Sequence, residues 1–78
     1  MSDPVFDAEL DVRKLACPLP ILRAKKSLSA MAAGRVLKVT ATDKGSPKDF
    51  VDFCSKTGNE LISSTGQDGE FIFLIRRR

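Results

Sequence analysis

The sequence contains no histidine, tryptophan or tyrosine, and its 78 residues include only two cysteines, Cys17 and Cys54. Without histidine, the chain cannot build a cysteine–histidine catalytic pair. A closed zinc site normally takes four cysteine or histidine ligands, so two cysteines cannot complete one. The two cysteines do not form a C-x-x-C redox motif, and a disulfide between them is not expected in the cytosol. We therefore expect no metal site and no cofactor.

Long apolar runs are also missing. No run approaches the roughly 20 residues of a membrane span, and residues 1–12 lack the basic-then-apolar layout of a signal peptide. We therefore expect a cytoplasmic protein that contacts no membrane. The chain is 42% hydrophobic and 29% charged, which is ordinary for a globular protein, and its length predicts a single domain over residues 1–78.

The net charge is +3 and the pI is about 9.1. This is only mildly basic and falls short of the dense positive charge of a dedicated nucleic-acid binder. Direct nucleic-acid binding is therefore not expected, whereas an acidic surface on a protein partner would suit the charge. We expect the chain itself to be a monomer.

The first half of the chain changes its hydrophobic period twice. Apolar and charged residues alternate over residues 6–13, which predicts a strand with one buried face. From Pro18 to Ala32 the apolar residues recur at steps of three and four, the period of a helix, and Gly34 provides a terminator. Residues 36–41 are rich in β-branched side chains and predict a second strand.

The second half begins with a helix signal. Ser46 is the expected cap, Pro47 the first helical residue, Asp49 the acidic residue three positions after the cap, and Gly58 ends the helix. Two strands over residues 60–65 and 70–75, joined by a turn, then predict a hairpin. The order β-α-β-α-β-β, with a right-handed crossover, predicts an α/β two-layer sandwich: a four-stranded mixed sheet with two helices on one face.

Cys17 stands at the expected start of the first helix, directly before Pro18 and close to Pro20. Proline loses nothing there, because the first-turn N–H groups have no intrahelical partner, and both prolines fix how the sulfur is presented. The remaining amides and the helix dipole favour an anion, so we predict a lowered pKa for Cys17. Such a thiolate would be a reactive nucleophile, although a plain capping or packing role explains the residue equally well.

Three cations near Cys17 in the sequence, Arg13, Lys14 and Arg23, are expected to add to this effect. A thiol ionised by its surroundings needs no general base. The reactivity expected of Cys17, argued in this way, depends on a sulfur that is both ionised and open to solvent.

These motifs resemble the TusA-type sulfur carriers, a family also described as SirA-like. The family signature is C-P-x-P at the start of the first helix, here Cys17 to Pro20, and the resemblance covers nearly the whole chain. The other matching positions are Leu10-Asp11, Leu15, Gly34, Asp43, Gly45-Ser46, Asp49-Phe50, Cys54, Gly58, Glu60-Leu61 and Leu74-Ile75-Arg76.

The resemblance implies a sulfurtransferase that works as a persulfide carrier. Cys17 would accept sulfane sulfur from a cysteine desulfurase and pass it to an acceptor protein, in tRNA 2-thiolation, molybdenum cofactor assembly or related sulfur trafficking. It also implies a two-layer α/β sandwich. One departure is Lys14, where the family commonly has glycine, so the turn before Cys17 is expected to differ or the lysine to take a role beside the thiolate.

Other residues allow both a functional and a plain interpretation. Lys44 lies in a loop expected on the Cys17 side of the sheet and is either part of the sulfur-handling surface or part of a turn. Arg23, Lys25 and Lys26 form a basic patch that either contacts acidic partners or is simply solvated. Cys54 is expected to be a small core residue, with a resolving thiol as the alternative.

The arginines at positions 76–78 are expected to form a disordered solubilising tail, with RNA binding as the alternative. Two other functions stay open at this point. The first is a small RNA- or protein-binding regulatory module without sulfur chemistry, and the second is a thiol peroxidase or redox sensor.

Overall fold

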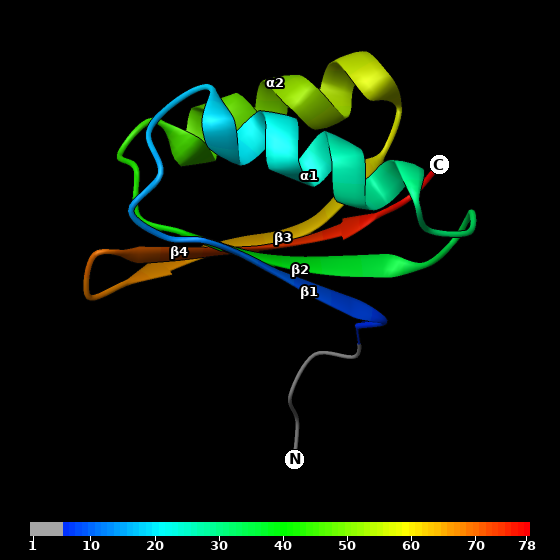
Figure 1. The fold of residues 1–78 in the computed structure, drawn as a ribbon, viewed down its shortest axis with the longest axis horizontal. Coiled ribbons are helices and arrows are strands. Elements are labelled where there is room, and N and C mark those ends of the chain that lie inside the picture. Colours follow the sequence, from blue (N-terminus) through cyan, green and yellow to red (C-terminus); the bar gives the residue numbers. More distant parts are fainter. Residues whose placement is uncertain (1–5) are drawn as a thin grey trace.

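Two helices cover one face of a four-stranded sheet in this computed structural model, which describes residues 6–78 (Figure 1). This confirms the predicted fold class and the β-α-β-α-β-β order. No helix among the described residues is long and apolar enough to cross a membrane. The elements are β1 (Ala8–Val12), α1 (Leu19–Ser29), β2 (Val36–Ala41), α2 (Ser46–Thr57), β3 (Glu60–Gln67) and β4 (Glu70–Arg76).

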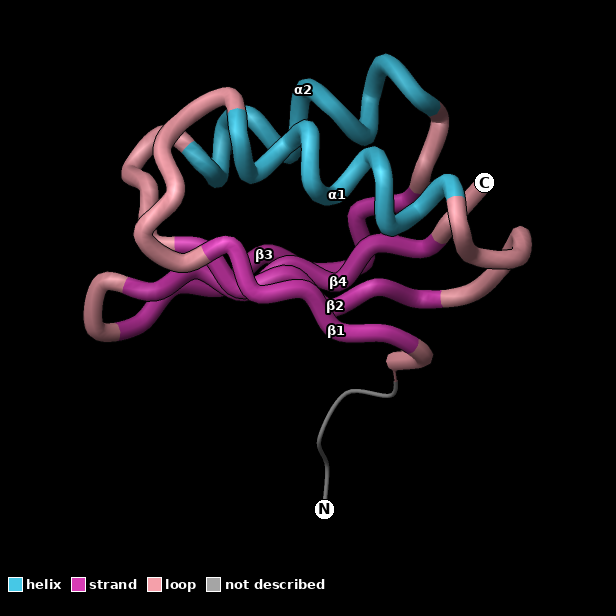
Figure 2. Tube along the Cα trace, in the orientation of Figure 1, coloured by secondary structure: helices cyan, strands magenta, loops and turns pink. Residues whose placement is uncertain are grey.

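The strands are arranged in the order β1-β2-β4-β3. β1 and β2 are parallel, whereas β4 pairs antiparallel with both β2 and β3. Parallel strands end at the same edge of a sheet. The loops over residues 13–18 and 42–45 therefore lie side by side (Figure 2), and the Lys14 N–H donates to the Thr42 hydroxyl at 2.8 Å.

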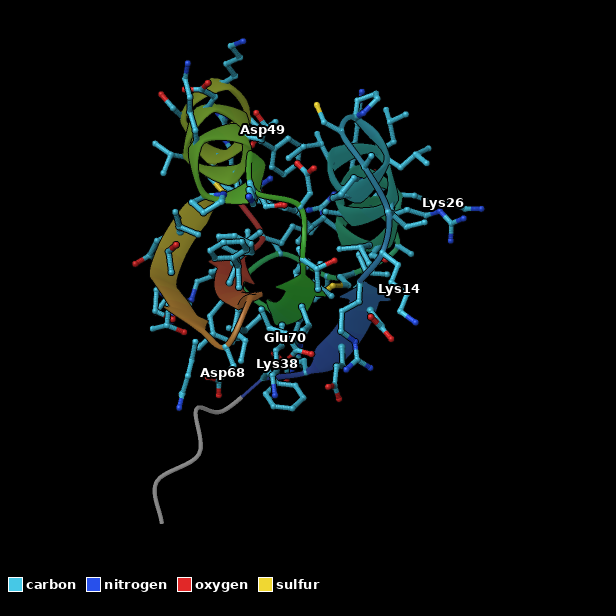
Figure 3. The ribbon with its side chains drawn as sticks, turned by 90° about the vertical axis from the view of Figure 1, so that its left-hand side faces the viewer. Lys14, Lys26, Lys38, Asp49, Asp68 and Glu70 are labelled. Atoms are coloured by element: carbon cyan, nitrogen blue, oxygen red, sulfur yellow. The ribbon has the colours of Figure 1, made fainter. Side chains whose placement is uncertain are left out.

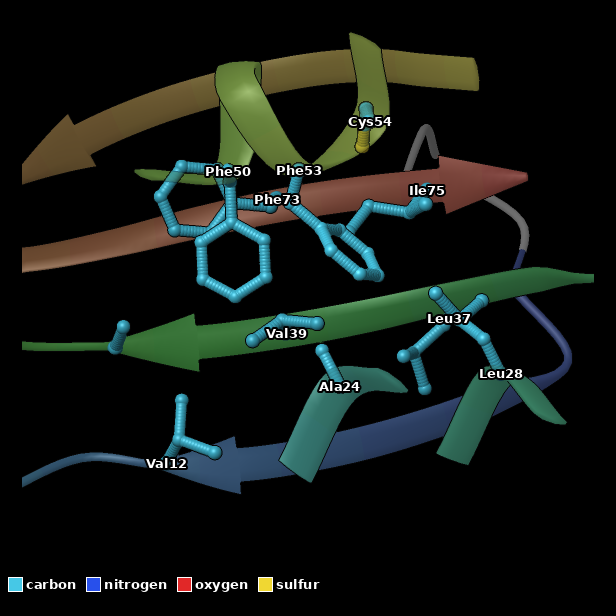
Figure 4. Packing of buried hydrophobic residues seen from close by; sticks show 11 residues of the cluster. Val12, Ala24, Leu28, Leu37, Val39, Phe50, Phe53, Cys54, Phe73 and Ile75 are labelled. Atoms are coloured by element: carbon cyan, nitrogen blue, oxygen red, sulfur yellow. The ribbon is translucent and has the colours of Figure 1, made fainter. Parts of the chain in front are cut away.

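The core lies between the helices and the sheet. Phe50 of α2 stacks on Phe73 of β4 with ring centroids 4.5 Å apart, and Phe53 meets Phe50 edge-on at 6.3 Å (Figure 4). These aromatic side chains supply much of the apolar area that a chain of this length can bury. The buried cluster consists of Val12, Ala24, Leu28, Leu37, Val39, Ala41, Phe50, Phe53, Cys54, Phe73 and Ile75.

In the first half of the chain, the predicted strand and the predicted helix are both longer than the observed ones. The first strand covers Ala8–Val12 rather than residues 6–13. The first helix covers Leu19–Ser29 rather than Pro18 to Ala32. At its end, the Ala30 and Met31 amides donate to carbonyls three residues back, at 3.2 and 3.0 Å, and this tighter turn ends the α-helix.

The predicted serine cap of the second helix is wrong. Gly45 is the N-cap, and Ser46 is the first helical residue, with its hydroxyl buried. The Asp49 N–H donates to the Gly45 carbonyl at 3.0 Å, so the backbone closes the first turn without a capping side chain. The other end of the helix follows the prediction: Gly58 adopts a left-handed conformation with φ of 80°.

The hairpin is tighter than predicted. Its turn consists of Asp68 and Gly69 alone, with φ values of 55° and 81°. This is the geometry of a two-residue turn that follows the twist of the strands, and Asp-Gly is a preferred sequence for it. β3 therefore extends to Gln67, and β4 begins at Glu70.

The expected disordered tail is instead part of the fold. Arg76 is the last residue of β4. The Arg77 guanidinium donates to the Leu28 carbonyl at 2.7 Å, and the Arg78 N–H donates to the side-chain oxygen of Asn59 at 2.8 Å. These hydrogen bonds hold the C-terminal residues against the last turn of α1 and against the segment that follows α2.

Candidate functional site

Cys17 is exposed, as predicted, in the loop that leads from β1 into α1. Pro18 is the N-cap of α1, Pro20 is buried at its second position, and the Cys17–Pro18 peptide bond is cis. The thiol therefore lies one residue ahead of the cap of α1.

A groove of about 420 Å³ runs between α1 and α2 and has Cys17 in its wall. Its surface is mostly apolar, with charged side chains contributed by both helices. The thiol is thus presented to solvent beside an open surface that a protein segment can enter. The lining residues are Cys17, Pro18, Ile21, Leu22, Lys25, Asp49, Asp52, Phe53, Lys56 and Thr57.

The predicted lowering of the Cys17 pKa is wrong in direction. The Asp49 carboxylate lines the same groove as the thiol, and hydrogen bonding to it favours the protonated form, which is the main cause of a raised pKa for Cys17. Partial desolvation and the negative charges of Asp49 and Asp43 act in the same direction. In the isolated chain these groups favour the protonated thiol over the thiolate.

The start of α1 offers little to offset these carboxylates. Pro18 and Pro20 have no N–H, the Leu19 N–H donates to the Ala16 carbonyl at 2.9 Å, and the Leu22 N–H donates to the Pro18 carbonyl. The prolines that stiffen the helix start thus also remove amides that an anion would need. The expectation depended on the remaining first-turn amides, but the Leu19 N–H is already used by the Ala16 carbonyl.

Arg13 does not act on the thiol. Its guanidinium pairs with Asp11 at 3.0 Å and with Glu70 at 3.3 Å, at the edge of the sheet. These contacts raise the pKa of Arg13, and the hydrogen bonds from Arg13 lower the pKa of Asp11 to about 2. Arg13 therefore fixes the end of β1 rather than the charge of Cys17.

Lys14 adopts the left-handed conformation, with φ of 67°. The chain therefore makes, with a lysine, a turn that glycine makes at lower cost. The hydrogen bond from the Lys14 N–H to Thr42 holds this turn against the neighbouring loop. The backbone conformation at Lys14 thus shapes the turn that leads to Cys17.

The predicted basic patch divides between two surfaces. Lys25 lines the groove with Cys17. Arg23 and Lys26 line a separate depression on α1, and Figure 3 shows Lys26 pointing away from α2. Lys44 is exposed in the loop before α2 but is not a lining residue of the groove. Only one of the four predicted partner-binding cations therefore shares a groove with Cys17.

Cys54 packs in the core as predicted, with 4% of its surface exposed. Burial raises its pKa to about 11. A thiol that is buried and protonated cannot readily resolve an oxidised or persulfidated Cys17.

Sequence analysis missed the contribution of α2 to this site. Asp49, Asp52 and Lys56 recur at steps of three and four, which places them on one face of a helix. Two features of the sequence could have revealed this face. The spacing of these charged residues places them beside the apolar stripe of the helix, and the parallel strands β1 and β2 bring the start of this helix to the same sheet edge as Cys17. Asp49 was instead taken as part of a capping signal.

Comparisons with known proteins all point to one family. The family model described as sulfurtransferase TusA matches residues 8–77. The sulfur carrier protein TusA of Allochromatium vinosum is 60% identical over 72 residues, which is 92% of this chain and 95% of that protein. The TusA of Pseudomonas entomophila is 38% identical over 78 residues, covering 100% of this chain and 98% of that protein.

The SirA-like protein of Desulfitobacterium hafniense, known from a crystal structure, superimposes with a TM-score of 0.79 at 25% identity, over 90% of this chain and 96% of that one. Fold, signature motif and sequence similarity thus agree, and the chain belongs to the TusA family of sulfurtransferases.

Proposed function

We propose that this chain is a sulfur carrier that takes a sulfane sulfur onto Cys17 from a cysteine desulfurase and delivers it to an acceptor protein. The observation that carries the proposal is the exposed Cys17 thiol at a groove between two helices, within the family's C-P-x-P motif. The high identity to a protein named as a sulfur carrier supports the same assignment.

The transfer needs one nucleophile and no resident cofactor. The Cys17 sulfur attacks the outer sulfur of a cysteine persulfide on the donor, and the S–S bond of the donor breaks. The donor cysteine leaves as a thiolate, Cys17 becomes a persulfide, and the proton of Cys17 passes to water or to the leaving thiolate. An acceptor thiolate then attacks the outer sulfur on Cys17, which returns to its starting state.

Docking of a partner protein must favour the thiolate of Cys17, because the isolated site favours the thiol. The pKa of Cys17 is raised in the free chain, so the thiolate has to form when a partner changes the surroundings of the sulfur. Leu19 and Leu22, on the first turn of α1, are 43% and 53% exposed, and they offer an apolar surface beside the thiol. Exposed leucines next to the reactive group suit contact with a protein partner.

The acceptor defines the pathway. Outlets consistent with the proposal are tRNA 2-thiolation, molybdenum cofactor assembly and related sulfur trafficking. The structure gives little support to the alternative of an RNA-binding module. Phe50, Phe53 and Phe73 are buried in the core, where they cannot stack on bases, and the terminal arginines bind back onto the fold.

Sulfur loading tests the proposal. The chain is incubated with a cysteine desulfurase, its cofactor and cysteine, and its intact mass is measured. We expect a gain of one sulfur atom in the wild type and in Cys54→Ser, and no gain in Cys17→Ser. Equal loading of both single variants would show that Cys17 is not the carrier.

A further inference from the structure

The carboxylate of Asp49 lies at the groove, and its charge also suits the positive end of the α2 dipole. Asp49 lies in the first turn of α2, and Figure 3 shows it on the side of that helix facing α1. None of the ion pairs within residues 6–78 includes Asp49. The first turn of α2 is closed by the Asp49 backbone, so the side chain is not needed as a cap.

We propose, resting on the carrier role of Cys17, that Asp49 is a positioning residue that holds the Cys17 thiol in its protonated form until a partner docks. Cys17, in the loop that leads into α1, and Asp49, in the first turn of α2, line the same groove, where the carboxylate is placed to accept a hydrogen bond from the thiol. A thiolate formed at this position would face a negative charge, which disfavours it.

The other charged groups of the groove do not cancel this effect. Asp43, from the loop after β2, adds a second negative charge near the sulfur. Asp52 of α2 lines the groove too. Lys25 and Lys56 are the lysines among the lining residues, and neither is a cause of the change in the Cys17 pKa.

The arrangement protects an exposed cysteine between transfers. Only the thiolate is an effective nucleophile, so a protonated thiol reacts slowly with oxidants and stray electrophiles. A donor that places a lysine or arginine against Asp49 would neutralise the carboxylate, and the thiol would then release its proton to water. A partner would thus be selected in part by a cationic side chain of its own that faces Asp49, although this chain as a whole carries a net positive charge.

The test is the pH dependence of Cys17 alkylation by iodoacetamide in the full chain, with Cys54→Ser as the background and no donor present. In Asp49→Asn we expect the midpoint of the alkylation rate to move to lower pH. Below the midpoint, each pH unit of displacement corresponds to about a tenfold faster rate. Asp49→Glu, which keeps the carboxylate, should move the midpoint back toward the wild-type position.

Asp52→Asn is the matched control, since it removes the same charge from the same groove. It should displace the midpoint less than Asp49→Asn does. An unchanged midpoint in Asp49→Asn, or an equal displacement in Asp52→Asn, would overturn the proposal. Circular dichroism checks folding, and Asp49→Ser repeats the comparison if Asp49→Asn unfolds. The alkylation midpoint is measured without a donor. A midpoint that contradicts the role of Asp49 is therefore distinct from a failure of sulfur loading, which would contradict the carrier role of Cys17.

Discussion

Replacing Lys14 with glycine should stabilise the protein. Lys14 has φ of 67°, a conformation in which the Cβ of an L-residue crowds the following carbonyl oxygen, at a cost of about 1–2 kcal/mol. Glycine avoids that cost but loses about 0.5–1 kcal/mol through its greater freedom in the unfolded chain. The hydrogen bond to Thr42 is made by the backbone and is kept. The expected net gain in the free energy of unfolding is about 0.5–1 kcal/mol.

Thermal unfolding followed by circular dichroism measures this gain. For a domain of this length, 1 kcal/mol shifts Tm by about 4–8 °C, so Lys14→Gly should raise Tm by several degrees. Lys14→Ala is the matched control, since it removes the charge but keeps the Cβ and therefore the crowding. A Lys14→Gly protein no more stable than Lys14→Ala would refute the argument from backbone conformation.

Three further predictions concern the core and the C-terminus. Phe50→Ala should cost about 3–5 kcal/mol in urea denaturation, because a fully buried ring stacked on another is lost; a cost below 1 kcal/mol would contradict this packing. The pKa of Cys54 is raised to about 11 in the folded chain. The contribution of this thiol to stability is therefore complete below about pH 9 and decreases as pH rises toward 11, by at most about 3 kcal/mol, and Cys54→Ala should show a shallower fall over this range. Arg77→Ala should lower the free energy of unfolding by about 0.5–1.5 kcal/mol through loss of the bond to the Leu28 carbonyl, whereas a freely mobile tail would show no change.

The succession of elements could be predicted from local patterns alone. The alternation before Val12 and the helical spacing from Ile21 to Met31 depend on which faces must be buried, and burial is the dominant favourable term in folding. The left-handed glycine at Gly58 likewise follows from local backbone sterics. Boundaries were less certain, because the i−3 hydrogen bonds that end α1 leave no mark in the sequence.

The sequence by itself determined the fold class, the family signature and the exposure of Cys17, since each depends on hydrophobic period or on residues adjacent in the chain. Only the tertiary structure decided the charge around that sulfur. Asp49 is far from Cys17 along the chain and meets it because α1 and α2 pack on one face of the sheet. A pKa responds to neighbours in space, whereas Arg13, a neighbour in sequence, turns away to Asp11 and Glu70.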